Sequence, residues 1–332
     1  MLLETHPAFA EHQTGHGHPE RPARLQAVLD GVAAAGVDDA LVRVAPEPAS
    51  RADLERVHPA AYLDAIETFC RAGGGAIDAD TTASAESWDA AVLAAGAGLD
   101  AIARLDRGEA DAAFCVVRPP GHHATPRRPM GFCLLNNIAI AAAALAERGE
   151  RVLVLDWDAH HGNGTQDAFY EDGRVTYVSM HQFPLYPGTG RLEETGRGLG
   201  AGATVNLPFP PGTTGDSYLT AFDEVVEPLA EALAPTWVLV SAGFDAHRAD
   251  PLTDLALSAG DYAALTRRSA ELVPAGRRLV FLEGGYDLDA LTASAGACVS
   301  ALAGERYEPE KPTAGGPGRN VVEAVVRLRA GN

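Results

Sequence analysis

Short apolar runs alternate with longer Ala-rich amphipathic stretches from about Asp111 onward. This alternation is typical of strand and helix units arranged around a parallel sheet. The predicted strands are Phe114–Val117, Arg151–Leu155, Val175–Met180, Thr204–Leu207, Trp237–Ser241 and Leu279–Leu282. The predicted helices between them are Leu134–Arg148, Ser217–Leu233, Ala259–Val273 and Leu288–Leu302. Because most of the strands are uninterrupted hydrophobic runs, we expect helices to cover both faces of the sheet.

The first hundred residues carry a mainly helical pattern, with Gly73–Gly75 as an expected flexible break. The predicted helices here are Arg21–Ala35, Ala60–Arg71 and Ser87–Leu105. Because no linker separates this part from the sheet, we predict one α/β domain over residues 1–332, with a mainly parallel central sheet and helices on both faces. The Pro- and Gly-rich stretch Glu305–Asn320 predicts a surface loop before a short amphipathic helix, Val321–Arg329.

Composition excludes two broad classes of protein. With 46% hydrophobic and 21% charged residues, the 332-residue chain has enough apolar material for a substantial core, which excludes wholesale disorder. Its 26 basic and 45 acidic residues give a formal net charge of −19, which disfavours the phosphate-binding surface of a nucleic-acid protein. An acidic surface attracts cationic substrates instead, over the short range that salt screening allows. We therefore expect no nucleic-acid partner.

Cysteine usage and hydropathy indicate a cytoplasmic protein without a membrane partner. The four scattered cysteines include no C-x-x-C pair, so neither a disulfide framework nor a cysteine zinc site is predicted. The segment Met1–Ala10 lacks the basic and apolar stretches of a secretory signal. The most apolar run, Cys133–Ala146, is too short for a membrane span and contains two asparagines. The sequence leaves a homo-oligomer open.

Residues capable of chemistry follow four of the predicted strands. The four segments are Arg118–Ala124, Asp156–Gly164, Ala242–Asp245 and Glu283–Tyr286. Because the carboxyl ends of parallel strands lie at one edge of a sheet, these loops should meet in one crevice. Any single aspartate among them is explained as readily by helix capping. The four loops together indicate a functional site.

Asp158, His160 and Asp245 are the candidate metal ligands. Asp158 and His160 are two residues apart, so in an extended segment their side chains point to the same side, and Asp245 can reach them from a neighbouring loop. Two carboxylates and one imidazole leave an open coordination position, as in a catalytic zinc site. Without a cation, Asp156 and these two carboxylates would crowd like charges in the crevice. The sequence therefore predicts one Zn²⁺ per chain.

His122, His123 and Tyr286 are candidates for proton transfer and oxyanion binding. Imidazoles shuttle protons near neutral pH, and Asp156 and Asn163 are available to fix their tautomers. A histidine against a carboxylate holds its proton more tightly than one against an amide, so the two histidines should differ in role. Tyr286 follows a double glycine, and a phenol hydroxyl suits an oxygen that gains negative charge. Considered one motif at a time, the two histidines could instead be a solvated pair in a loop, and Tyr286 could be a packed core residue.

These residues resemble the zinc-dependent histone deacetylase superfamily, which also contains bacterial histone deacetylase-like amidohydrolases, acetylpolyamine amidohydrolases and acetoin-utilisation proteins. The matching motifs are His18–Pro22, Val57–Leu63, Arg118–Ala124, Asp156–Gly164 and Glu283–Tyr286. They are long and specific, and they extend over nearly the whole chain. The resemblance implies an arginase/deacetylase-like fold and hydrolysis of linear amides. The first motif, and Asn163 where class I enzymes have Asp, resemble the class II branch.

The resemblance also implies a role for each matching residue. The implied zinc ligands are Asp158, His160 and Asp245. The implied general base, and later general acid, is His123, paired with Asn163. His122, oriented by Asp156, is implied to act mainly through its charge. Tyr286 is implied to polarise the amide carbonyl. A K⁺ ion near Asp156 and Ser179 is implied as well.

The family's acyl-lysine tunnel matches three positions of this chain. Phe132 and Tyr186 would form its walls, with Tyr where Phe is usual, and the Gly131 carbonyl would accept the substrate amide proton. Leu252 matches a position where polyamine-selective members carry a glutamate gatekeeper, so it favours acyl-lysine or another neutral amide. Further candidates for the rim are Asp80, more readily a solvated loop carboxylate, together with Pro184, Arg191, His247 and Arg248.

The predicted function is zinc-dependent removal of acetyl or other acyl groups from a small-molecule or peptide amine such as acyl-lysine. An acetylpolyamine amidohydrolase is the alternative. A manganese ureohydrolase is less favoured, because it needs more bridging carboxylates for two metals. A non-enzymatic binding protein is disfavoured, since every required side chain is present. The natural amide, the preferred acyl length and the choice between zinc and iron are left open.

Overall fold

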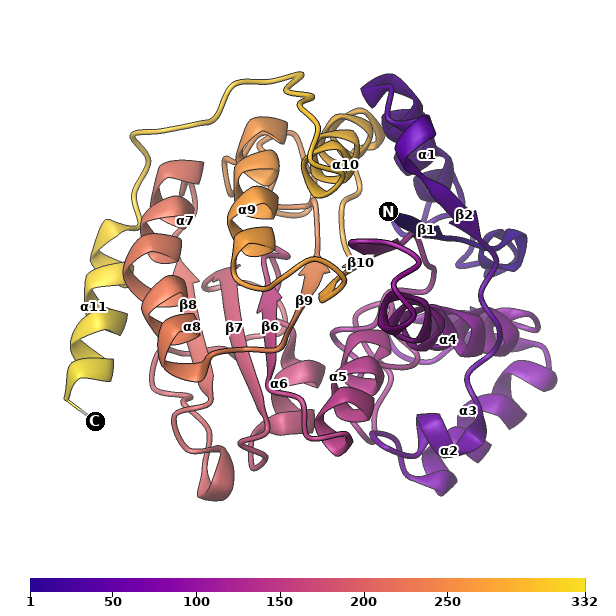
Figure 1. Ribbon diagram of the computed structural model, residues 1–332. Helices are drawn as coiled ribbons and strands as arrows, with labels where there is room; N and C mark the ends of the chain where they lie inside the picture. The colour runs from indigo at the N-terminus through magenta and orange to yellow at the C-terminus, as the bar shows by residue number, and fades with distance from the viewer. Residues whose placement is uncertain (332) are drawn as a thin grey trace.

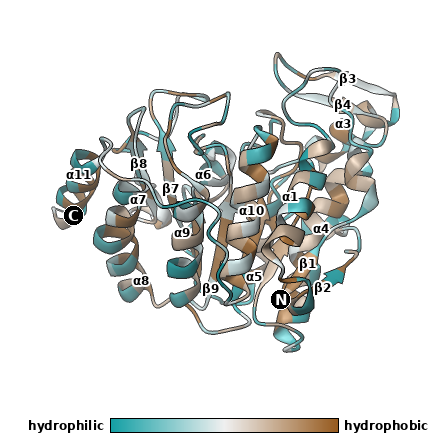
Figure 2. Cartoon of the chain, turned by 90° about the horizontal axis from the view of Figure 1, so that it is seen from above, coloured by the Kyte–Doolittle hydropathy of each residue, from teal (hydrophilic) through white to brown (hydrophobic). Residues whose placement is uncertain are grey.

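The computed structural model describes residues 1–331 and is built on an eight-stranded sheet (Figure 1). The strands are β1 Leu2–Glu4, β2 Val42–Val44, β5 Ala113–Cys115, β6 Val152–Asp156, β7 Val175–Gln182, β8 Thr204–Phe209, β9 Trp237–Ala242 and β10 Arg278–Leu282. Their order is β2-β1-β5-β10-β9-β6-β7-β8, and every neighbouring pair is parallel. A small antiparallel pair, β3 Gly74–Ala76 and β4 Thr82–Ser84, projects at one end of the molecule (Figure 2).

Helices cover both faces of the sheet. The α-helices are α1 Ala23–Ala35, α2 Arg51–Leu54, α3 Ala60–Arg71, α4 Ser87–Asp106, α5 Asn137–Glu147, α6 Asn163–Phe169, α7 Gly215–Ala221, α8 Glu227–Leu233, α9 Ala259–Glu271, α10 Leu288–Leu302 and α11 Arg319–Ala330. Shorter segments are the 3-10 turns η1 Pro7–Ala10, η2 Asp38–Ala40 and η3 Gly198–Gly200, and the π-helical η4 Phe222–Val226. In Figure 1, α1, α10 and α9 lie side by side, while α4 and α5 pack against the strands from the other face.

The burial pattern explains this three-layer arrangement. Every residue of β6, β7 and β9 is buried, as expected for strands with helices on both sides. The outer turns of α8 and α9 are hydrophilic in Figure 2. Within residues 1–331, none of the helices combines the length and the apolar character that a membrane crossing requires. The cysteines are all buried and unpaired.

The structure confirms the predicted α/β class with a mainly parallel sheet and shows local differences. The six predicted strands correspond to β5 through β10, whereas β1 and β2 have only three residues each and carry no periodic signal. The expected break at Gly73–Gly75 is partly wrong, because β3 begins at Gly74. The predicted helix Ser217–Leu233 is formed by α7, η4 and α8 in succession. Residues 303–318 run as irregular backbone between α10 and α11.

Glu4 in β1 carries a buried carboxyl group, neither oxygen of which has a hydrogen-bond partner among residues 1–331. Burial, reinforced by the charge of Asp100, raises the pKa of Glu4 from 4.5 to about 8. Between these pH values the unfolded chain has released the proton and the folded chain keeps it, so the free energy of unfolding falls as pH rises.

At pH 8 we therefore expect Glu4→Gln to increase the free energy of unfolding by on the order of 2 kcal/mol and so to raise the Tm. At pH 5 the substitution should change the Tm little. Thermal unfolding followed by circular dichroism at both pH values checks this. Glu305→Gln, on an exposed residue, controls for the loss of one negative charge. An equal Tm for Glu4→Gln and the wild type at pH 8 would show that Glu4 is not a destabilising buried acid.

Candidate metal centre and active site

The four loops predicted to meet do so at the carboxyl edge of four neighbouring strands. In the sheet, β5, β10, β9 and β6 are adjacent in that order. The segments that follow them bring His122, His123, Asp158, Asp245 and Tyr286 into one region. Two of these residues, with His160, form a cluster with the geometry of a metal site.

Asp158, His160 and Asp245 offer ligand atoms that all lie within 4.8 Å of one another. The Nδ1 atom of His160 is 2.9 Å from Oδ2 of Asp245 and 3.2 Å from Oδ1 of Asp158. The backbone N–H of Gly284 donates to Oδ2 of Asp158 at 2.8 Å, and that of Ala159 donates to Oδ1 of Asp245 at 2.8 Å. Each of these two hydrogen bonds fixes the orientation of one carboxylate group. The two carboxylates and the imidazole are therefore aimed at a common point.

The charges of this cluster fit a cation. Burial raises the pKa of Asp245 to about 7, and the negative charge of Asp158 adds to this effect. Burial also acts against ionisation of Asp158, but the positive charge of His122 and the hydrogen bond from His160 hold the pKa of Asp158 below its usual value. Against burial, hydrogen bonds to both carboxylates raise the pKa of His160 to about 10. The two carboxylates thus favour a positive charge between them, and a divalent cation would supply it.

His122 is held against Asp156. Its Nδ1 atom lies 3.0 Å from Oδ2 of Asp156, which also accepts a hydrogen bond from the Tyr177 hydroxyl at 2.9 Å. Burial disfavours the imidazolium, but the charges of Asp156, Asp158 and Glu283 outweigh it and raise the pKa of His122 to about 10. His122 therefore stays protonated at neutral pH and contributes positive charge.

His123 is held against an amide instead. Its Nδ1 atom lies 2.8 Å from Oδ1 of Asn163, and the Asn163 amide N–H₂ donates to the backbone oxygen of His123 at 3.3 Å. Since an amide oxygen only accepts, Nδ1 carries the hydrogen and Nε2 is left free to take a proton. Burial, with the charges of His122 and His160, lowers the pKa of His123 well below its usual value. His123 is a neutral base.

Tyr286 is fixed through its backbone and its ring. Its N–H donates to Oδ2 of Asp250 at 2.7 Å, and the Arg24 side chain donates to the Gly285 carbonyl at 2.7 Å. The Arg24 guanidinium carbon lies 5.1 Å from the centre of the Tyr286 ring, which meets Phe132 edge to face at 5.7 Å. Burial raises the pKa of Tyr286 well above its usual value, so the hydroxyl keeps its proton.

A cavity of about 200 Å³ opens beside these groups. It is lined by Asp80, His123, Gly131, Phe132, His160, Leu185, Tyr186, Leu252 and Tyr286. All four residues predicted for substrate contact are therefore in its lining. A side chain at Gly131 would put Cβ 2.4 Å from the His123 ring, and its φ of 56° also favours glycine. Phe132 has φ 68°, an uncommon conformation that turns the backbone at the cavity wall.

The rim differs from expectation at several residues. Asp80 is half-buried in the cavity lining, bonded to the Thr81 hydroxyl at 2.7 Å, rather than a solvated loop carboxylate. His247 and Arg248 are outside the lining, because both side chains bind Glu310. Arg191 stacks over Phe183 instead of reaching the cavity, and Pro184 is outside the lining as well.

Ser179 lies beside Asp156, its register partner across β7 and β6. The Ser179 hydroxyl is 2.8 Å from Nδ1 of His181, and both carboxylate oxygens of Asp156 accept hydrogen bonds. A K⁺ ion at this position stays a prediction.

Sequence reasoning missed the role of Glu283. Its carboxylate accepts the backbone N–H groups of Gly121 at 2.7 Å and His122 at 3.1 Å, and the Ser241 hydroxyl at 3.2 Å. Burial raises the pKa of Glu283 to about 7. The sequence shows that Glu283 directly follows a predicted strand. Only the fold shows that its carboxylate binds the backbone at the start of the loop that contains His122 and His123.

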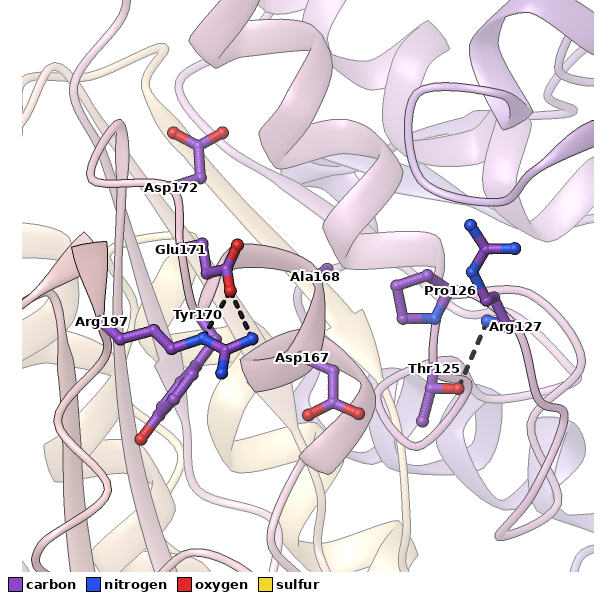
Figure 3. A pocket seen from close by; sticks show the side chains of 9 residues that line it. All are labelled: Thr125, Pro126, Arg127, Asp167, Ala168, Tyr170, Glu171, Asp172 and Arg197. Atoms are coloured by element: carbon purple, nitrogen blue, oxygen red, sulfur yellow. Dashed lines mark hydrogen bonds and ion pairs between the residues drawn. The ribbon is translucent and has the colours of Figure 1, made fainter. Parts of the chain in front are cut away.

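A larger groove, about 560 Å³, lies outside this site (Figure 3). It is lined by Thr125, Pro126, Arg127, Asp167, Ala168, Tyr170, Glu171, Asp172 and Arg197, all exposed or half-buried. Glu171 forms an ion pair with Arg197 across one side of it (Figure 3). None of the predicted site residues lines this groove, so the smaller cavity is the candidate active site.

Comparison with known proteins agrees with this geometry. A sequence model of the histone deacetylase domain matches residues 18–302. A probable deacetylase of Archaeoglobus fulgidus is 41% identical over 92% of this chain and 89% of the relative. A histone deacetylase-like amidohydrolase of Pseudomonas aeruginosa is 41% identical over 84% of this chain and 74% of the relative. The crystal structure of the HDA15 HD domain superposes with a TM-score of 0.91 at 37% identity, covering 99% of this chain and 94% of that one.

Proposed function

The chain belongs to the histone deacetylase domain family, and on that premise we propose that it is a zinc-dependent amidohydrolase that removes acyl groups from an amine such as acyl-lysine. One observation carries the proposal: His160, between Asp158 and Asp245, lines the same cavity as His123 and Tyr286. A candidate metal centre, a neutral histidine and a phenol donor thus face one space large enough for a side-chain amide.

Asp158, His160 and Asp245 would hold one Zn²⁺ per chain, because two carboxylates and an imidazole are three ligands and leave a coordination position open. When bound, the ion would polarise the amide carbonyl and lower the pKa of a water molecule toward about 7. Manganese ureohydrolase chemistry is disfavoured by the family match. We also propose that the chain belongs to the class II branch, which its motifs favour. The unpaired cysteines favour a cytoplasmic location.

The chain's own residues supply the proton transfers. His123 accepts the proton of the attacking water at its free Nε2 and returns it to the amine nitrogen as the carbon–nitrogen bond breaks. His122 stays protonated against Asp156 and offsets the negative charge that gathers in the site. The Tyr286 hydroxyl donates to the carbonyl oxygen as that oxygen becomes negative. The products are a carboxylic acid and a free amine.

The cavity lining favours a neutral aliphatic chain. Phe132, Tyr186 and Leu252 present aromatic and aliphatic surface, which suits the methylene chain of acyl-lysine. Asp80 in the same lining is the observation that favours the second candidate, an acetylpolyamine, since a carboxylate attracts its free ammonium groups.

A substrate panel separates the two candidates. We expect kcat/KM for an acetyl-lysine peptide to exceed that for N-acetylspermidine by about tenfold, a difference of about 1.4 kcal/mol in transition-state binding. Leu252→Glu should shift the ratio toward the polyamine, because it adds a carboxylate to the lining. Leu199→Glu, on a leucine that is 90% exposed and outside the cavity, is the control for charge alone. Faster wild-type cleavage of N-acetylspermidine would establish the polyamine candidate instead.

A further inference from the structure

The irregular segment 303–318 lies across the end of the helical layer. In Figure 1 it passes as a yellow coil from α10 over the ends of α9 and α7 to α11. The histone deacetylase domain match ends at residue 302, directly before this segment begins. We call residues 305–318 the strap.

Glu310 is the strap residue that contacts the loop following the candidate metal ligand Asp245. Its Oε2 atom is 2.7 Å from Nε2 of His247 and accepts the backbone N–H of Ala259, at the start of α9, at 2.9 Å. Its Oε1 atom accepts a hydrogen bond from the Arg248 guanidinium. The His247 side chain is only 4% exposed and that of Glu310 is 24% exposed, so the bond between them is partly buried. Glu310 therefore ties the loop that contains His247 to the first turn of α9.

That loop carries three elements of the candidate site. It begins at Asp245, whose carbonyl accepts the Thr253 hydroxyl at 2.5 Å. It continues through Asp250, whose N–H donates to the His247 carbonyl at 2.9 Å and whose carboxylate accepts the Tyr286 N–H at 2.7 Å. Asp250 also accepts the N–H of Leu252, in the cavity wall, at 3.0 Å. A shift of His247 would thus be transmitted to a metal ligand, to the phenol donor and to the wall.

We propose that Glu310 is a positioning residue for the Asp245–Leu252 loop, so that the strap forms part of the active-site support. The inference rests on the proposed function for its catalytic consequence, while its effect on metal binding stands apart from any substrate. Partners behind metal ligands set ligand orientation, and their loss weakens metal binding. Glu310 would act on the metal ligand Asp245 through His247, which lies two residues after Asp245 in the same loop.

The rest of the strap is anchored independently of Glu310. The Lys311 carbonyl accepts the Ser258 hydroxyl at 2.8 Å, and the Thr313 hydroxyl donates to Asp261 at 2.8 Å. A side chain at Gly260 would place Cβ 2.5 Å from the Glu310 carbonyl, which shows how closely the strap lies on α9. Removing the Glu310 carboxylate therefore cuts the link to His247 and leaves the strap in place.

Three variants of the full chain test the proposal. In Glu310→Ala the zinc Kd, measured by competition with a chromogenic chelator, should rise about tenfold, and kcat/KM on the best panel substrate should fall about tenfold. Glu310→Gln keeps an oxygen that can accept from His247 and Ala259, so it should stay within about threefold of the wild type. Thr313→Ala loosens the strap at Asp261 and should lower the Tm without changing the zinc Kd.

The outcomes are distinguishable from failure of the proposed function. A wild type that binds zinc but cleaves no panel member would refute the function, while the zinc Kd values would still test the role of Glu310. An unchanged zinc Kd in Glu310→Ala would overturn the inference. So would an equal rise in the zinc Kd for Glu310→Ala and Thr313→Ala, because that would reflect loosening of the strap in general.

Discussion

Replacement of His160 by alanine is expected to abolish metal binding and amide hydrolysis together. The cluster offers three protein ligands, and the imidazole is the only neutral nitrogen donor among them once its proton is displaced. Its removal leaves the buried carboxylates of Asp158 and Asp245 facing each other without the imidazole that bonds to both. We expect the bound zinc per chain to fall from one to near zero and kcat/KM to fall by at least about 1,000-fold, since metal and oxyanion stabilisation are lost at once.

The adjacent histidine provides a matched control. The ring of His161 is turned to other partners, with Nδ1 2.7 Å from the Thr189 hydroxyl and Nε2 3.0 Å from Oε1 of the Gln166 side-chain amide. His161→Ala should therefore keep about one zinc ion per chain. Measuring metal by atomic absorption on dialysed protein compares the two variants directly. Full metal content in His160→Ala would mean that the ligand set is wrong.

Tyr286→Phe is expected to lower kcat by about 100-fold while zinc stays bound and KM changes little. Loss of one preorganised oxyanion donor costs roughly 10²- to 10³-fold in kcat. Phenylalanine fits the same space, because the ring of residue 286 packs against Phe132 and Arg24 and the backbone is held by Asp250. The substitution therefore removes the hydroxyl and leaves the cavity otherwise unchanged.

Tyr186→Phe is the control for this prediction. Tyr186 lines the same cavity, and its ring meets His123 edge to face at 5.2 Å, but the proposed reaction gives its hydroxyl no part. Its kcat should stay within about threefold of the wild type. Steady-state kinetics on one substrate measures both variants. Equal kcat for Tyr286→Phe and the wild type would remove Tyr286 from the mechanism.

The central sheet and the convergence of the four loops could be predicted from the sequence, because both depend on local patterns of apolar residues. Apolar runs, most of them uninterrupted, identify β5 through β10, and parallel strands place their carboxyl ends at one edge. The two-residue spacing of Asp158 and His160 is likewise local information. β1 has three residues, ends on Glu4 and lacks the longer apolar run that marks β5, so the N-terminal edge of the sheet could not be predicted.

The remaining features depend on contacts between distant segments. His247 binds Glu310, which is 63 residues away, so its sequence position beside Asp245 wrongly suggested the rim. Asp80 reaches the cavity because the segment between β3 and β4 carries it there. Arg24 bonds to a carbonyl 261 residues later. Neither periodicity nor local motifs encode such pairings.

The most direct test of the central claim is anomalous diffraction at the zinc absorption edge from crystals of the chain grown with Zn²⁺. The account predicts one ion per chain, at about 2.0 to 2.2 Å from Nδ1 of His160 and from oxygens of Asp158 and Asp245. Two ions bridged by carboxylates, or an ion bound elsewhere with these three side chains apart, would contradict it.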